Sequence, residues 1–94
     1  MGTELDALLT NGDTVGILEV KSTLHTNDVE RVHERLIARF RTFFDEYADK
    51  KLLVMVAGEL VNPDALVLAH ECGFVCLTPD NKKVVIDASH ARVY

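Results

Sequence analysis

Two short apolar runs open the chain, at residues 5–9 and 15–20, and a polar segment that contains Asn11-Gly12 separates them. An Asn-Gly pair between two such runs is the strongest short-range signal for a two-residue type I′ hairpin turn. We therefore expect the chain to begin with a β-hairpin whose loop is Asn11-Gly12.

A long stretch of helical periodicity follows the hairpin and runs to about Ala48. Asn27, with Glu30 three residues later, is typical of a capping pair at a helix start. The apolar residues that form one stripe at spacings of three and four are Val29, Val32, Leu36, Ile37, Phe40, Phe43, Phe44 and Tyr47. The stripe predicts a helix with one buried face, and the Phe40, Phe43, Phe44 and Tyr47 cluster is expected to be core.

The second half of the chain alternates between strand and helix patterns. Asn62 before a proline is typical of a helix start, and Gly73 stands where a left-handed residue ends a helix. Residues 78–81 favour a turn. The expected elements are a strand at 51–57, a helix at 63–72, and strands at 74–77 and 84–87. The predicted order is β-β-α-β-α-β-β, an α/β fold with a mixed sheet flanked by helices.

Composition and charge limit the function classes. The 94 residues carry a net charge of −5, which argues against tight nonspecific binding to DNA phosphates, although carboxylates that bind metal ions add to such a total. We interpret the chain as one domain, 1–94, of a cytoplasmic protein without membrane spans, because no apolar run approaches roughly 20 residues. Cys72 and Cys76 are expected to be reduced core thiols.

The hairpin register decides which side chains share a face. With Asn11-Gly12 as the loop, Asp6 pairs with Ile17 and Glu4 pairs with Glu19. One face then carries Glu4, Asp6, Ile17, Glu19 and Lys21. The other face, which we expect to be core, carries Leu5, Ala7, Leu9, Leu18 and Val20.

The first of these faces has the donors of a metal site. Asp6 lies diagonally across from Glu19, at about 7 Å between backbones, which short side chains can bridge through a cation. The like charges of Glu4 and Glu19 are destabilising when directly opposite, and a divalent ion removes that cost. Mg²⁺ typically takes one or two carboxylates and keeps waters and substrate phosphate as its other ligands. Lys21 is placed to stabilise charge on a phosphate under attack.

The spacing of these residues resembles that of a known family. Asp6, followed twelve residues later by Glu19-Val20-Lys21, resembles the PD-(D/E)XK nucleases, whose hallmark is an Asp on one strand and Glu-x-Lys on the next. The stretch AHECGFVCL at 69–77 looks like an uncharacterised subgroup of bacterial and archaeal members, and the resemblance covers residues 4–87.

The resemblance implies a restriction-endonuclease-like fold and a nuclease that hydrolyses DNA phosphodiester bonds with Mg²⁺ or Mn²⁺. Asp6 and Glu19 would be metal ligands, Val20 would supply its backbone carbonyl, and Lys21 would assist the nucleophilic water. Leu5 stands where the family often has Pro. The family's first helix and first strand do not precede Glu4, so we expect a domain truncated at its N-terminus, with the exposed edge of the strand at 5–9 covered by another chain in a homodimer.

Several alternatives stay open. The chain can be a catalytically inactive relative that serves as an interaction or dimerisation module, or a different α/β fold with merely exposed carboxylates. Arg31, Arg35 and Arg39 either meet a phosphate backbone or, as we prefer, form a solvated face beside Asp28, Glu30 and Glu34. The residues that we interpret as bystanders rather than metal ligands are His25, His33, His70, Cys72 and Cys76.

Overall fold

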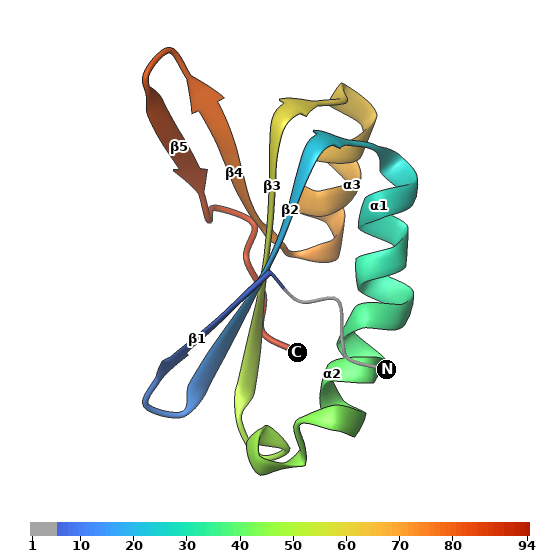
Figure 1. Cartoon of the computed structure of the whole chain (residues 1–94), viewed down its shortest axis with the longest axis vertical. Coiled ribbons are helices and arrows are strands. Elements are labelled where there is room, and N and C mark those ends of the chain that lie inside the picture. The colour runs from blue at the N-terminus through green and yellow to red at the C-terminus, as the bar shows by residue number, and fades with distance from the viewer. Residues whose placement is uncertain (1–5) are drawn as a thin grey trace.

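The computed structural model describes residues 6–94, which form an α/β domain around a mixed five-stranded sheet. The strands lie side by side in chain order, with a parallel centre and an antiparallel strand at each edge (Figure 1). Their bounds are β1 (Ala7–Asn11), β2 (Thr14–Leu24), β3 (Lys51–Val61), β4 (Val75–Asp80) and β5 (Lys83–Asp87). The predicted α/β class with a mixed sheet is confirmed.

The helices cover one face of this sheet, and the described residues leave the opposite face bare (Figure 1). The helical elements are α1 (Thr26–Arg31), the π-helical η1 (Val32–Leu36), α2 (Ile37–Phe43), the 3₁₀ turn η2 (Asp45–Tyr47) and α3 (Pro63–Cys72). Crossovers between parallel strands are right-handed, and both crossovers here move in the same direction along the sheet, so their helices lie on the same side.

The hairpin forms, but its loop is Gly12-Asp13 rather than Asn11-Gly12. Asn11 pairs with Thr14, and Leu8 pairs with Ile17, so the predicted register was wrong by two residues. Gly12 has φ 62° and stands at the first central position, as a type II′ turn requires, whereas a type I′ turn would also need a positive φ at the second position. The shift is even, so every side chain keeps its predicted face.

The assignment of the core face was wrong. Val15 and Ile17, on the face of Glu19, are 1% and 0% exposed and lie under the helices. Leu9 and Val20, on the face expected to be core, are 57% and 48% exposed. Both faces of β2 are apolar, so alternation along the strand did not distinguish them, and the crossovers decided which one the helices cover.

The long helix begins earlier and ends earlier than predicted. His25 precedes its first turn, and the His25 N–H donates to Asp28 Oδ2 at 2.9 Å, so Asp28 and not Asn27 completes the cap. The α-helical part ends at Phe43, which is 51% exposed, so its assignment to the core was wrong. Phe40 is buried and stacks on Phe44 with ring centroids 5.0 Å apart.

The second helix matches its predicted bounds. Asn62 Oδ1 accepts from the Asp64 N–H at 2.9 Å, and Gly73 ends the helix with φ 78°. The predicted turn at 78–81 was wrong, because β4 continues through Asp80 and the chain reverses at Asn81, whose φ is 57°. The missing N–H of Pro79 is tolerated there because β3 pairs with β4 only from Val75 to Leu77.

Glu4 and Leu5, and with them the predicted Glu4–Glu19 pair and the expected truncation before Glu4, lie outside the described residues. Within 6–94, no helix has the length and apolar character required to cross a membrane.

Candidate functional site

Strand β2 carries the centre of the site. Glu19 lies on the helix-covered face two residues beyond the buried Ile17, pairs with Val56 of β3 and is itself only 7% exposed. Lys21 follows on the same face, and its side chain is 31% exposed. Removing an ionised carboxylate from water is costly unless a partner compensates it. Glu19 therefore occupies a position where the fold alone favours an apolar residue.

Asp6 is held against the edge of β2 by the backbone. The Val20 N–H donates to Asp6 Oδ2 at 2.8 Å. Continuing the observed β1–β2 register by one residue places Asp6 directly opposite Glu19, closer than the predicted diagonal. The structure thus brings together Asp6, Glu19 and Lys21, and the corrected loop position brings the two carboxylates nearer to each other.

The carboxylate of Glu19 is only partly compensated. Oε1 lies 3.4 Å from Lys21 Nζ, whereas Oε2 is buried and has no hydrogen-bond partner among the described residues. Burial raises the pKa of Glu19 and the nearby charge of Asp6 raises it further, while Lys21 and Arg31 act in the opposite direction. A buried acceptor without a donor is uncommon in folded proteins and indicates a missing cation, proton or water.

The donor set fits a divalent ion of the Mg²⁺ type. No group of three or more His, Cys, Asp or Glu side chains is assembled anywhere in 6–94, but Mg²⁺ commonly takes only one or two carboxylates. The N–H and C=O of a strand residue point to the same edge, so the Val20 carbonyl faces the edge where Asp6 lies. Two carboxylates, one of them with an unpartnered oxygen, and a backbone carbonyl are available together.

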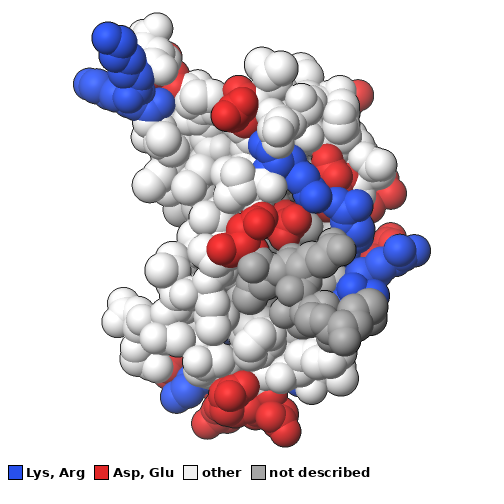
Figure 2. Space-filling model, in the orientation of Figure 1, with Lys and Arg blue, Asp and Glu red and all other residues white. Residues whose placement is uncertain are grey.

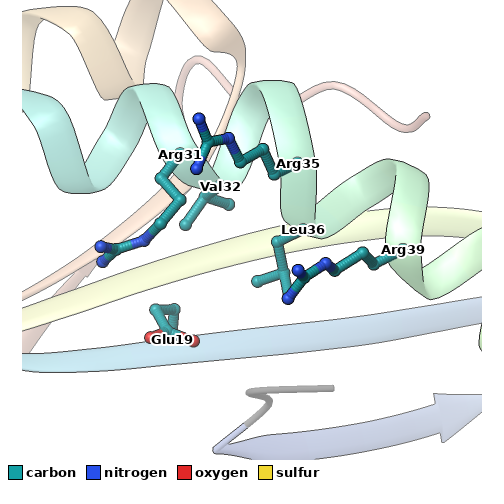
Figure 3. Close-up of a pocket in the computed structure, with 6 residues that line it drawn as sticks. All are labelled: Glu19, Arg31, Val32, Arg35, Leu36 and Arg39. Carbon is teal, nitrogen blue, oxygen red and sulfur yellow. The ribbon is translucent and has the colours of Figure 1, made fainter. Parts of the chain in front are cut away.

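A cavity of about 210 Å³ opens above Glu19, between β2 and the long helix. Figure 3 shows the Glu19 carboxylate at its floor and the arginine side chains of the helix along its wall. The residues that line it are Glu19, Arg31, Val32, Arg35, Leu36 and Arg39. All three arginines are exposed, as the expected solvated face requires, and they also line the cavity above Glu19. Their spacing of four residues was the signal, but only the packing of the helix on β2 shows what they face.

The surroundings of His33, Cys72 and Cys76 indicate structural roles for these residues. The His33 ring lies 6.2 Å from Phe74 and 5.9 Å from Tyr94, between ring centroids, away from the cavity lining. Cys72 and Cys76 are buried free thiols, as expected. Burial raises the pKa of Cys76 to about 11, which disfavours the thiolate that a zinc site needs.

Comparisons with protein-family models, with curated proteins and with solved structures find no match for this chain.

Proposed function

We propose that this chain is a metal-dependent nuclease domain of restriction-endonuclease-like fold that hydrolyses DNA phosphodiester bonds. The observation that carries the proposal is the meeting of Asp6, Glu19 and Lys21 beside a cavity, with the Glu19 Oε2 buried and unpartnered among residues 6–94. The resemblance of these residues to the PD-(D/E)XK pattern supports this reaction class and the choice of DNA.

The residues divide the chemistry among them. Asp6, Glu19 and the Val20 carbonyl would hold Mg²⁺ or Mn²⁺, which when bound polarises a phosphoryl oxygen and acidifies a water. Lys21 is partly exposed and can turn its ammonium from Glu19 toward the phosphate, where it stabilises the negative charge that grows as the water attacks. The hydrogen bond from Val20 fixes Asp6, so that the ligand set is ordered before substrate arrives.

Cleavage of plasmid and branched DNA with Mg²⁺ or Mn²⁺ tests the proposal. Asp6→Ala and Lys21→Ala should each abolish cleavage, because they remove a metal ligand and a transition-state charge, respectively. The exposed pair Asp13 and Lys51, at 3.8 Å, provides matched controls, since Asp13→Ala and Lys51→Ala delete the same groups far from the cavity. A wild-type chain that fails to cleave any substrate, or an Asp6→Ala variant as active as Asp13→Ala, excludes the proposal.

A second candidate function is a homodimerisation module without cleavage activity. The bare face of the sheet supports it, because Leu9, Val20, Val84 and Ile86 are between 48% and 66% exposed there. Contiguous apolar patches on monomers usually mark interaction sites. The same face on a second copy is the partner with matching chemistry, because a two-fold dimer buries identical patches against each other.

A further inference from the structure

The arginines of the long helix form a row along the wall of the cavity. Arg31, Arg35 and Arg39 follow one another at intervals of four, and all three line the cavity (Figure 3). In an ideal α-helix of about 3.6 residues per turn, side chains eight residues apart are rotated by about 80° from each other. The π-helical turn η1 (Val32–Leu36) lies between them, and its longer i→i+5 hydrogen bonds place more residues in each turn. The π turn therefore reduces the rotation between the first and last arginine and keeps the row on the side of the helix that faces the cavity.

The row is only partly neutralised by the protein. Arg31 Nη2 lies 2.9 Å from Asp28 Oδ1, in a bond that holds its guanidinium beside Glu19. The side chains of Arg35 and Arg39 make neither a hydrogen bond nor an ion pair with any residue from 6 to 94. All three arginines are exposed, as the expected solvated face requires, but only Arg31 pairs with a neighbouring carboxylate among the described residues.

The surroundings of the arginine row indicate that its ligand is an extended anionic polymer. The chain has a net charge of −5, yet Figure 2 shows a band of Lys and Arg side chains across this face, beside a group of acidic side chains. The cavity of about 210 Å³ is below the range of about 300–1,000 Å³ typical for enclosed small ligands. An open wall of guanidinium groups beside a small cavity suits a polymer that places one phosphate in the cavity and its neighbours along the row.

We propose that Arg35 and Arg39 bind the sugar–phosphate backbone of one nucleic-acid strand next to the phosphate held at Asp6, Glu19 and Lys21. This inference rests on the proposed phosphodiester substrate. Arg31 to Arg39 spans about 12 Å of helix at about 1.5 Å per residue. One strand of a duplex presents a phosphate about every 3.4 Å along its axis, so the row covers about three to four phosphates. Guanidinium groups bind such oxygens in bidentate geometry.

Binding of fluorescein-labelled oligonucleotides of about ten nucleotides, as single-stranded DNA, duplex DNA and single-stranded RNA, tests the proposal by anisotropy across a salt series. Ca²⁺, which takes oxygen ligands as Mg²⁺ does, occupies the acidic centre, and a gel confirms that each probe stays intact. The variant is Arg35→Gln with Arg39→Gln. The charge-matched control is Lys82→Gln with Lys83→Gln, two exposed lysines at the β4–β5 turn.

The arginine variant should bind about tenfold more weakly, as the loss of two exposed charge contacts implies. Its slope of log affinity against log salt should fall by about two, whereas the lysine variant should keep the wild-type values. Binding of the DNA probes alone would identify DNA as the ligand. Equal affinity for the RNA probe would show that the arginines bind the phosphates and do not distinguish deoxyribose from ribose.

An equal loss in both variants, unchanged binding by the arginine variant, or no binding by the wild type would overturn the inference. Binding that depends on Arg35 and Arg39, without cleavage in Mg²⁺ or Mn²⁺, leaves the inference standing and removes the proposed nuclease activity. Cleavage of DNA together with binding that does not depend on Arg35 and Arg39 would support the proposed nuclease activity and overturn the inference about the arginines.

Discussion

Burial of the Glu19 carboxylate destabilises the folded protein, and its contact with Lys21 offsets this cost only in part. Its side chain is 9% exposed, one oxygen lies near Lys21, and the other has no partner in the described part of the chain. Its pKa is raised by burial and by Asp6, so the folded protein disfavours the ionised carboxylate relative to the unfolded chain. For a carboxyl of this kind, stability decreases as the pH rises through the folded-state pKa.

We predict that Glu19→Gln stabilises the metal-free protein above that pKa. The amide removes the repulsion by Asp6 and the desolvated charge, so the free energy of unfolding should increase by about 1 kcal/mol at about pH 8. The difference should shrink at a lower pH, once the pH has fallen through the folded-state pKa and the wild-type carboxyl has taken up a proton. Urea unfolding in EDTA at both pH values measures it, and a variant less stable than the wild type at the higher pH contradicts the prediction.

Addition of Mg²⁺ to the wild type and to Glu19→Gln tests whether Glu19 is a metal ligand. An ion that binds only the folded state stabilises it by mass action. The melting temperature of the wild type should therefore rise with Mg²⁺, and that of Glu19→Gln should rise less, because one carboxylate ligand is gone. An equal response of both proteins would remove Glu19 from the metal site.

At the scale of elements, the residue that caps the start of α1 differs from the residue that the sequence pattern indicated. Asn27 and Glu30 have the spacing of a capping pair, yet Asp28 makes the contacts, to the His25 N–H and to Arg31. The Asn27 side chain is exposed and makes no hydrogen bond with residues 6–94. Several residues near a helix start have capping side chains, and the path of the preceding strand selects among them.

We predict that Asp28→Ala lowers the free energy of unfolding by about 1–2 kcal/mol, because it leaves the His25 N–H without its acceptor and releases Arg31. Asn27→Ala serves as the control and should change stability by less than about 0.5 kcal/mol. Chemical denaturation of both variants measures the difference. A loss for Asn27→Ala that equals or exceeds the loss for Asp28→Ala would contradict the prediction.

The hairpin shows how a candidate site can be predicted from a sequence that does not determine its register. Asn11-Gly12 correctly indicated a reversal, and the Asp6 and Glu-x-Lys spacing indicated which side chains meet. The loop position depended on whether Asn11 takes a positive φ, which local sequence does not decide. Because the error was an even number of residues, the faces were preserved and the site residues still met.

The core face and the arginine row could not be predicted in the same way. Alternation identifies two faces of β2, but Ile17 and Val20 are both apolar, and the choice between them depends on where the helices return. The position of Arg35 and Arg39 above Glu19 follows from that choice. Long-range packing thus decided both features, whereas local patterns sufficed for α3 with its proline start and glycine end.

At the scale of the whole molecule, the bare sheet face presents exposed apolar side chains to a second copy. The described sheet has five strands, which at about 4.8 Å apart span roughly 24 Å. Its longest strands, β2 and β3, have 11 residues, or roughly 36 Å at about 3.3 Å per residue. Because β1, β4 and β5 have only five or six residues, the strands cover roughly 600 Å² at these spacings, which approaches the roughly 800 Å² per partner that stable interfaces bury. A second copy that presents the same face can cover its apolar side chains, and the charged residues of β3 on this face, Lys51 and Glu59, lie near the two ends of the strand.

We predict that the chain is a dimer of twice 10.5 kDa in solution and that Leu9→Lys with Ile86→Lys converts it to a monomer of 10.5 kDa. Both side chains are more than half exposed, so the lysines cost the isolated fold little, but in the dimer they bury unpaired charges. Val67→Lys, at a position 56% exposed on α3, is the control, because it adds a lysine on the helix-covered side, away from the bare face. Light scattering over a concentration series measures the masses. A wild-type mass of 10.5 kDa at every concentration, or a dimer unaffected by the two lysines, would show that the bare face does not bind a second copy.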